Sequence, residues 1–261
     1  MLEKYEGTLV FSGEDRYGVV EIVDKETLRY LHLGTQIRQS SMFLNDPYAL
    51  AVEYTQQMTV SLLFQPQPHR VLFLGLGGGS LPKFFWSHLP NCRVDAVEIS
   101  PLVIETSMNF FNVPREDSRM HLINEDANYF LKRAQNRLYD LIFVDLYSSE
   151  GISSAVSRSD FFDQCFRLLK KTGILVWNMW RIGDPTTIQK TLKNMARVFG
   201  RNLLALPATH DSIFILFMFK DSPTHYSMEK ISENARTFHA KTHIDFETFL
   251  SKLDWSAVCS V

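Results

Sequence analysis

Four glycines follow a short apolar segment in the sequence VLFLGLGGGSL, and they could bring the backbone close to a ligand. They are Gly75, Gly77, Gly78 and Gly79. Glycine has no Cβ, so such a turn can adopt positive φ, and the helix expected from Leu81 offers unpaired N–H groups at its N-terminus. A strand, a glycine turn and a helix in this order predict a nucleotide site, although a tight turn without a ligand would use the same residues. The turn is not a P-loop, because no Gly-Lys-Ser/Thr follows it.

Acidic side chains stand at the ends of the apolar segments that come next. Glu98 closes the segment VDAVEI, where a carboxylate can accept hydrogen bonds from two ribose hydroxyls. Asp126, in NEDA, could accept from an adenine amino group or cap the helix expected from Ala127, and both roles stay open. Asp145, in YDLIFVDL, would face the cleft beside a transferred group. The three carboxylates together indicate a nucleoside site that also supports group transfer.

The residues after Asp145 form a loop, LYSSEG, that could close over such a site. Tyr147 and Glu150, with Asp145, are the candidates for positioning or deprotonating an acceptor. The side chains that end a later strand are expected to wall the acceptor pocket, with ordinary core packing as the alternative. They are Trp177, Asn178 and Trp180.

The elements that must position these residues alternate in type from residue 70 onward. Strands are expected at 71–74, 94–99, 120–123, 139–146 and 173–178, with helices between them. This alternation predicts a parallel sheet with right-handed crossovers. Two further strands without an intervening helix, at 203–207 and 213–219, predict one antiparallel strand at the edge. The order is that of an α/β fold of the class I methyltransferase-like (Rossmann-like) type, in which the ligand lies at the carboxyl ends of the strands.

The regions on either side of this alternation suggest three parts. Residues 1–45 are expected to form a small N-terminal β domain around a hairpin of strands 17–23 and 28–33. Residues 46–68 are a connecting helix and linker, with Asp46 and Pro47 as its N-cap and first residue, and residues 69–261 are the methyltransferase-like domain. The last segment is expected to be helical and to dock through apolar side chains. They are Phe238, Phe246, Phe249, Leu250 and Leu253.

The composition narrows the function class. The chain has 261 residues, of which 45% are hydrophobic, so a sizeable core is expected. A formal net charge of −2 and the absence of a basic run disfavour a nucleic-acid partner. Three separate cysteines, and His239 and His243 without a third ligand, predict no metal site, and a reducing cytoplasm is the expected location. The sequence has no apolar run of about 18 residues, so no membrane span is expected.

Several segments together resemble the spermidine synthases (polyamine aminopropyltransferases) over residues 17–200. They are the hairpin, GTQIRQSS, DPYALAVEYTQQM, VLFLGLGGGSL, VDAVEI, NEDA and YDLIFVDL. The resemblance implies a homodimer, an S-adenosylmethionine-type ligand and no metal. By position it implies that Gln39 and Tyr54 line the donor and acceptor site and that Gly75 and Gly77 lie under the nucleoside. It likewise implies that Glu98 holds the ribose, and that Asp126 with Ala127 holds the adenine.

The sequence departs from the family pattern at two places. The glycine turn of the synthases resembles G-G-G-D-G-G, and Gly78 stands at the acidic position. Their D-x-x-D-P-x-G pattern matches at Asp145 and Gly151, but Ser148 replaces the second aspartate. In the family these aspartates handle amines, and a neutral side chain cannot supply their charge to a polyamine. Glu150 could replace one of them only after a rearrangement of the loop.

The GLGGGSL form of the turn is similar to a second branch of relatives, which includes lysine methyltransferases with a spermidine-synthase-like domain. Without an aspartate, the turn would leave room for the carboxylate of intact S-adenosylmethionine, which backbone N–H groups could bind. The first interpretation is therefore methyl transfer to an unidentified acceptor. The alternatives are aminopropyl transfer from decarboxylated S-adenosylmethionine through a rearranged acidic site, and a non-catalytic nucleoside-binding or scaffold protein.

Overall fold

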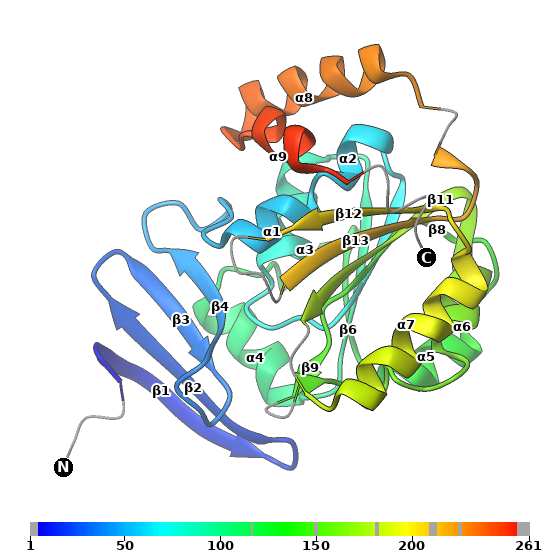
Figure 1. Ribbon diagram of the computed structural model, residues 1–261. Helices are drawn as coiled ribbons and strands as arrows, with labels where there is room; N and C mark the ends of the chain where they lie inside the picture. Colours follow the sequence, from blue (N-terminus) through cyan, green and yellow to red (C-terminus); the bar gives the residue numbers. More distant parts are fainter. Residues whose placement is uncertain are drawn as a thin grey trace.

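A computed structural model describes residues 5–115, 117–148, 151–180, 183–208, 213–223 and 226–254. It contains a four-stranded antiparallel sheet beside a seven-stranded, mostly parallel sheet with helices on both faces (Figure 1). The predicted α/β class, with a small N-terminal β unit and a Rossmann-like sheet, is therefore confirmed.

The N-terminal sheet consists of strands paired in chain order. They are β1 (Thr8–Asp15), β2 (Gly18–Lys25), β3 (Leu28–His32) and β4 (Arg38–Phe43). The expected hairpin is present as β2 and β3, but its loop is shorter than expected, because Glu26 adopts a positive φ of 56° that closes it tightly. One face of the sheet buries Val20, Ile22, Leu31 and Met42 against helix α4 (Pro101–Phe110).

The prediction that Asp46 and Pro47 begin a helix is wrong. Residues 46–52 form turns and bends, and the helices start later, as α1 (Glu53–Met58) and α2 (Ser61–Phe64). Proline is tolerated at the first position of a helix but does not impose one. Leu50 is buried in the core, and the Tyr48 ring lies 6.0 Å from the Trp86 ring, so tertiary contacts decide the path of this segment.

The large sheet has the strand order β12-β13-β11-β8-β5-β6-β7. Its strands are β5 (Arg70–Leu74), β6 (Arg93–Glu98), β7 (Met120–Asn124), β8 (Tyr139–Val144), β11 (Leu169–Trp180), β12 (Leu203–Pro207) and β13 (Ile213–Phe219). The expected antiparallel strand is β13, but it does not lie at the edge, because it pairs with both β11 and β12. Its sequence, IFILFMF, is apolar on both faces, as a strand inside a covered sheet requires.

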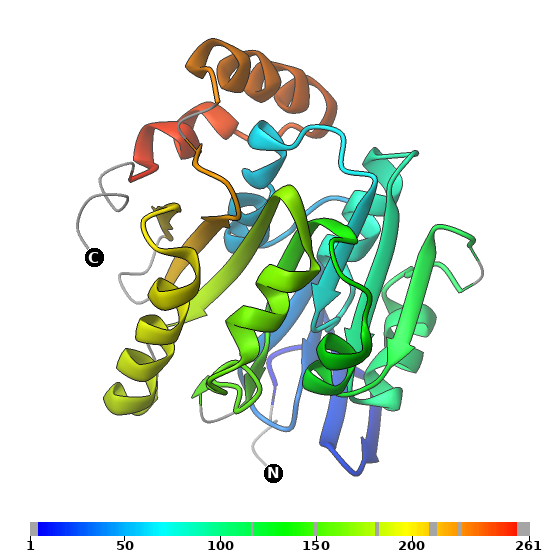
Figure 2. The same cartoon turned by 90° about the vertical axis from the view of Figure 1, so that its right-hand side faces the viewer.

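Alternate side chains of these strands point to opposite faces of the sheet and pack into two separate hydrophobic cores. Val71 and Phe73 belong to one buried cluster, whereas Leu72 and Leu74 belong to the other. The remaining helices are α3 (Ser80–His88), α5 (Ala127–Arg133), α6 (Phe161–Leu168), α7 (Pro185–Phe199), α8 (Met228–Thr242) and α9 (Phe246–Lys252). Figure 2 shows α5, α6 and α7 together in front of the sheet.

The end of the described chain docks on the core through the side chains that the sequence indicated. Phe238, Phe246, Phe249 and Leu253 are buried, and Leu250 packs against the same cluster. These residues belong to α8 and α9 or follow them directly, and the two helices lie next to α2 (Figure 1). In the described ranges, no helix combines the length and apolar character needed to span a membrane.

Helix α4 connects the two sheets. Near its N-terminus, Ser100 Oγ donates a hydrogen bond of 2.6 Å to Oδ2 of Asp15, the last residue of β1. Near its C-terminus, Arg29 Nη1 donates a hydrogen bond of 2.8 Å to the carbonyl oxygen of Phe110. The N-terminal sheet is therefore fixed along the helix at both ends, and it faces the carboxyl ends of β5 and β6.

Candidate functional site

A cavity of about 420 Å³ lies between the N-terminal sheet and the carboxyl ends of β5, β6, β8 and β11. This is the size of a small-molecule site, and it lies where α/β sheets bind ligands. The N-terminal sheet contributes Tyr17, Gln39 and Ser40 to the lining, so the site is shared by both units of the chain.

The glycine turn forms part of the cavity wall. Gly75 and Gly77 line it, with positive φ values of 94° and 53°. A Cβ at Gly75 would lie 2.4 Å from the carbonyl oxygen of Asp145, and one at Gly77 would lie 2.7 Å from Ser40 Oγ. Both the backbone conformation and the close packing therefore require glycine. Gly78 is buried and does not line the described part of the cavity.

The N–H groups of this turn bind acceptors within the protein. Gly75 N donates to Val97 O (2.9 Å), and Gly79 N donates to Leu76 O (2.9 Å). Gly78 N donates to Ser40 Oγ at 2.9 Å. These three N–H groups have acceptors within the protein, and binding of a ligand carboxylate by the turn stays a prediction.

Glu98 lines the cavity at the end of β6, and both of its carboxylate oxygens accept backbone hydrogen bonds. Oε2 accepts from Leu76 N at 3.1 Å, and Oε1 accepts from Ser100 N at 3.0 Å. Withdrawal from water raises the pKa of Glu98, while these N–H groups act in the opposite direction. The carboxylate lies at the wall of the cavity, where hydroxyl groups of a ligand could donate hydrogen bonds to it.

Asp126 has the capping role that the sequence left open. Its Oδ1 accepts hydrogen bonds from Asn128 N at 2.9 Å and Tyr129 N at 3.2 Å, at the N-terminus of α5. Neither Asp126 nor Ala127 is among the described residues that line the cavity. Their contact with an adenine ring stays a prediction.

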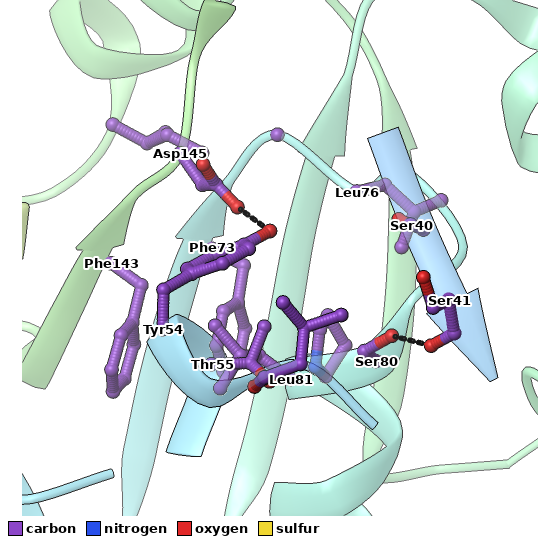
Figure 3. Close-up of a pocket in the computed structure, with 14 residues that line it drawn as sticks. Ser40, Ser41, Tyr54, Thr55, Phe73, Leu76, Ser80, Leu81, Phe143 and Asp145 are labelled. Atoms are coloured by element: carbon purple, nitrogen blue, oxygen red, sulfur yellow. Dashed lines mark hydrogen bonds between the residues drawn. The ribbon is translucent and has the colours of Figure 1, made fainter. Parts of the chain in front are cut away.

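Asp145 is held by two side chains from other elements. Tyr54 Oη, from α1, donates to Oδ2 at 3.1 Å, and Asn178 Nδ2, from β11, donates to Oδ1 at 2.9 Å; Figure 3 shows the first of these bonds. Withdrawal from water raises the pKa of Asp145, and the two hydrogen bonds oppose this effect. The pKa of Tyr54 is raised well above its usual value, so its hydroxyl remains a donor. The arrangement suits a carboxylate that receives a proton or an N–H group.

Tyr147 lines the same cavity but its hydroxyl is occupied. It donates to the carbonyl oxygen of Asn178 and accepts from Trp180 N at 2.6 Å. Withdrawal from water raises its pKa, so it keeps its proton. The geometry therefore favours a positioning role over proton removal. Ser148 belongs to the short strand β9 (Tyr147–Ser148), which pairs with β10 (Gly151–Ile152), whereas Glu150 and the Ser148 side chain lie outside the described residues.

Trp177 is not brought to the cavity. Its side chain is fully buried, and its ring lies 5.6 Å from the Phe162 ring in the core. Asn178 and Trp180 do line the cavity. Two of the three residues expected to wall the acceptor pocket therefore line the cavity. Trp177 instead packs in the core, which was the alternative expectation.

A second, smaller cavity of about 30 Å³ adjoins the first (Figure 3). It shares Ser40, Tyr54 and Asp145 with the larger cavity. Its other walls combine hydroxyl and apolar side chains. They include Ser41, Thr55, Ser80, Leu81, Phe73 and Phe143. Asp145 is the one carboxylate among the described residues that borders both cavities.

The sequence did not reveal the contribution of Asp15 and Ser40. Asp15 accepts from Ser100, and Ser40 accepts from the glycine turn. Both belong to the N-terminal sheet, and although Ser40 lies in the segment GTQIRQSS, directly after Gln39, the sequence did not indicate its contact with the glycine turn. Within the described ranges, no group of three or more His, Cys, Asp or Glu side chains could hold a metal ion.

The chain is similar to known proteins over most of its length. Residues 24–228 match the family model described as the spermine/spermidine synthase domain. A polyamine aminopropyltransferase from Chromobacterium violaceum is 33% identical over 235 residues, which cover 90% of this chain and 88% of the relative.

Two solved structures show the same fold. A probable spermidine synthase from Corynebacterium glutamicum has a TM-score of 0.72 at 19% identity, covering 90% of this chain and 88% of that chain. Human methyltransferase-like protein 13 in complex with SAH has a TM-score of 0.59 at 24% identity, covering 73% and 88%. These two structures share the fold, and on the family match the chain belongs to the spermine/spermidine synthase domain family.

Proposed function

We propose that the chain is a transferase that binds an S-adenosylmethionine-type nucleoside in the larger cavity and transfers its methyl group to an acceptor. The observation that carries this proposal is that two carboxylates, Glu98 and Asp145, line one cavity beside a glycine turn. One carboxylate can accept hydrogen bonds from hydroxyl groups, and the other is held where an acceptor would lie.

The nucleoside half of the proposal rests on the fit of the cavity wall. Gly75 and Gly77 form a surface that any Cβ would disrupt, and the Glu98 carboxylate lines the cavity beside it. Gln39 lines the same space from the N-terminal sheet. These residues would hold the sugar, and Asp126 with Ala127 would contact the base.

The transfer half rests on Asp145 and its partners. A bound sulfonium donor supplies an activated methyl group, so the protein has to align the nucleophile and accept its proton. Asp145 can accept that proton, because withdrawal from water raises its pKa. Asn178 Oδ1 is buried beside it and has no hydrogen-bond partner in the described part of the chain. An acceptor that carries N–H groups could donate one hydrogen bond to this amide oxygen and another to the Asp145 carboxylate.

Aminopropyl transfer is the second candidate, because the relative from Chromobacterium violaceum is a polyamine aminopropyltransferase. Asp145 and Tyr54 would serve that reaction equally well. A decarboxylated donor and a polyamine acceptor, however, bring more ammonium groups, which require carboxylates. Gly78 and Ser148 stand where the family pattern has two of them, which favours methyl transfer.

Calorimetric titration distinguishes these functions. The chain is titrated with S-adenosylmethionine, its decarboxylated form and methylthioadenosine, which carries no charged tail. Methyl transfer predicts tighter binding of intact S-adenosylmethionine than of the decarboxylated form. The opposite preference would support aminopropyl transfer, and no binding of any of the three would favour a scaffold protein.

A further inference from the structure

The amino edge of the large sheet, at the opposite end from the cavity, is rich in basic residues. Every strand of that sheet except the antiparallel β13 has a basic residue within two positions of its first residue. Because parallel strands start at the same edge, these residues follow one border of the sheet. From β12 across to β7 they are Arg201, Lys171, Arg137, Arg70, Arg93 and Arg119.

Two of these side chains are paired with carboxylates of the protein. Arg70 Nη2 lies 2.8 Å from Oδ2 of the buried Asp95, and Arg119 Nε lies 3.7 Å from Asp117 Oδ1. The other four are exposed, and none of them has a carboxylate within ion-pair distance in the described part of the chain. We call these four cations the basic row. They are Arg93, Arg137, Lys171 and Arg201.

Capping of helix ends does not account for the basic row. Cations are favoured at helix C-termini, and two other bases at this edge have that role. Arg167 Nη1 donates to the carbonyl oxygen of Ala134, the C-cap of α5, at 2.8 Å, and Lys220 Nζ donates to that of Phe166, in α6, at 2.6 Å. Within the described ranges, no member of the basic row makes such a bond.

The positive charge at this edge is not neutralised by its surroundings. The pKa of Lys220 is lowered by burial and, in addition, by the charge of Arg137. Arg137 also has a positive φ of 51°, which a long side chain rarely adopts. The whole chain has a formal net charge of −2, so the excess of positive charge is a local feature of this edge.

The length of the basic row matches a short extended peptide. The strands of its outer members, β12 and β6, are five strand spacings apart, or about 24 Å at about 4.8 Å each. An extended segment of about seven residues has this length, and its alternate side chains point to the same side. Carboxylates at alternate positions of such a segment could therefore pair with several of the four cations.

A nucleic acid fits this edge less well. Single strands are bound by stacking on aromatic rings, and among the described residues the exposed aromatic side chains are Tyr17 and Tyr129. Tyr17 lines the cavity, and Tyr129 lies in the first turn of α5, which starts beyond the carboxyl end of β7. The net negative charge of the chain would also repel a long polyanion.

We propose that the basic row binds a short acidic segment of a partner protein in an extended conformation. The cavity lies at the carboxyl ends of the strands, so docking at the amino edge leaves it open. The inference does not depend on the proposed function, because it concerns a second surface of the chain and not the reaction.

The first test is fluorescence anisotropy with a labelled peptide of about eight residues, in which glutamate alternates with threonine. The same peptide with glutamine in place of glutamate is the uncharged control. The wild-type chain is expected to bind the acidic peptide at least about tenfold more tightly than the control peptide. Equal affinities for the two peptides would overturn the proposal.

The second test removes members of the basic row in pairs. Arg137→Asn/Lys171→Gln neutralises the neighbouring strands β8 and β11, and asparagine tolerates the positive φ at position 137. Arg93→Gln/Arg201→Gln neutralises the outer members, and it keeps the test valid if the first variant does not fold. Each pair is expected to weaken binding of the acidic peptide about tenfold. Unchanged affinity in both pairs would overturn the proposal.

Two controls separate a specific surface from general electrostatics. Lys190→Gln/Lys193→Gln, at exposed positions of α7, changes the net charge equally and should bind the acidic peptide like the wild type. An equal loss in this control would overturn the proposal, and so would tighter binding of an oligothymidylate of the same length than of the peptide. Methylthioadenosine affinity should be unchanged in all three variants, so a failure here is distinguishable from a failure of the nucleoside site.

Discussion

Asp15 and Ser100 form a hydrogen bond of 2.6 Å between the N-terminal sheet and the start of α4. Ser100 also donates its backbone N–H to Glu98 and accepts from Val103 N through Oγ. Ser100, the N-cap of α4, therefore connects the end of β1, the first turn of the helix and the carboxylate expected to hold the ribose. The nucleoside end of the cavity depends on the docked N-terminal sheet.

Asp15→Ala is expected to weaken both folding and nucleoside binding. It leaves Ser100 Oγ without this acceptor, at a cost of about 1–3 kcal/mol in the free energy of unfolding. Methylthioadenosine affinity should fall as well, because the cavity wall at Tyr17 loses its anchor. Glu14→Ala, at the exposed neighbouring position, is the control. Unchanged stability and affinity for Asp15→Ala would contradict the connection described above.

Glu98→Ala tests the ribose assignment. It removes two carboxylate oxygens from the cavity, and the loss of two charge-assisted hydrogen bonds should weaken methylthioadenosine binding about 100-fold. Glu105→Ala, on the exposed face of α4, should bind like the wild type. The readout is calorimetric affinity, and an affinity for Glu98→Ala equal to that of Glu105→Ala would exclude the assignment.

Asp145→Asn separates transfer from nucleoside binding. The amide cannot accept the acceptor's proton, so the transfer rate should fall about 10²–10⁴-fold. Methylthioadenosine binding should persist, because Glu98 and the glycine turn are intact. Asp46→Asn, at an exposed position outside the cavity, is the matched control. A transfer rate equal to that of the control would remove Asp145 from the reaction.

The pH dependence of transfer should follow the pKa of Asp145, which withdrawal from water raises. The reactive carboxylate is the deprotonated form, so the rate should fall as the pH drops below that raised value. Asn178→Ala removes a donor that stabilises the charged form, so the pKa rises further and the acidic limb moves to higher pH. The measurement is the transfer rate at saturating acceptor as a function of pH. If the acidic limb of Asn178→Ala lies at the same pH as that of the wild type, a group other than Asp145 titrates.

Tyr147→Phe distinguishes a positioning role from a base. The substitution leaves Trp180 N and Asn178 O without their partner, and the cost should be about 1–3 kcal/mol in the free energy of unfolding. The transfer rate should fall modestly, and its pH profile should keep its shape. Loss of a titrating limb in this variant would identify Tyr147 as a proton acceptor instead.

The sequence was most informative where a functional residue lies directly beside the strand that positions it. Glu98 and Asp145 end or follow their strands, and Gly75 and Gly77 follow theirs, so the strand pattern located them. The position of Tyr54 came from the family resemblance alone. Its hydrogen bond to Asp145 spans 91 positions and depends on how α1 packs against the sheet.

Two errors have a common physical origin. Whether Trp177 or its neighbours line the cavity depends on which face of β11 each side chain occupies. The pairing of β11 with β8 and β13 determines that face. The place of β13 inside the sheet is likewise decided by pairing between strands. The contacts of Asp15 and Ser40 could not be predicted, because their partners lie on elements of the other unit and no local pattern encodes such a contact.

The attachment of α4 also sets a direction. Asp15 lies at the positive end of the helix dipole, and Arg29 lies at its negative end. If the N-terminal sheet were reversed along the helix, each side chain would meet a pole of its own sign. The dipole of α4 therefore favours one orientation of the N-terminal sheet along the helix, and that orientation determines which edge of the sheet faces Glu98.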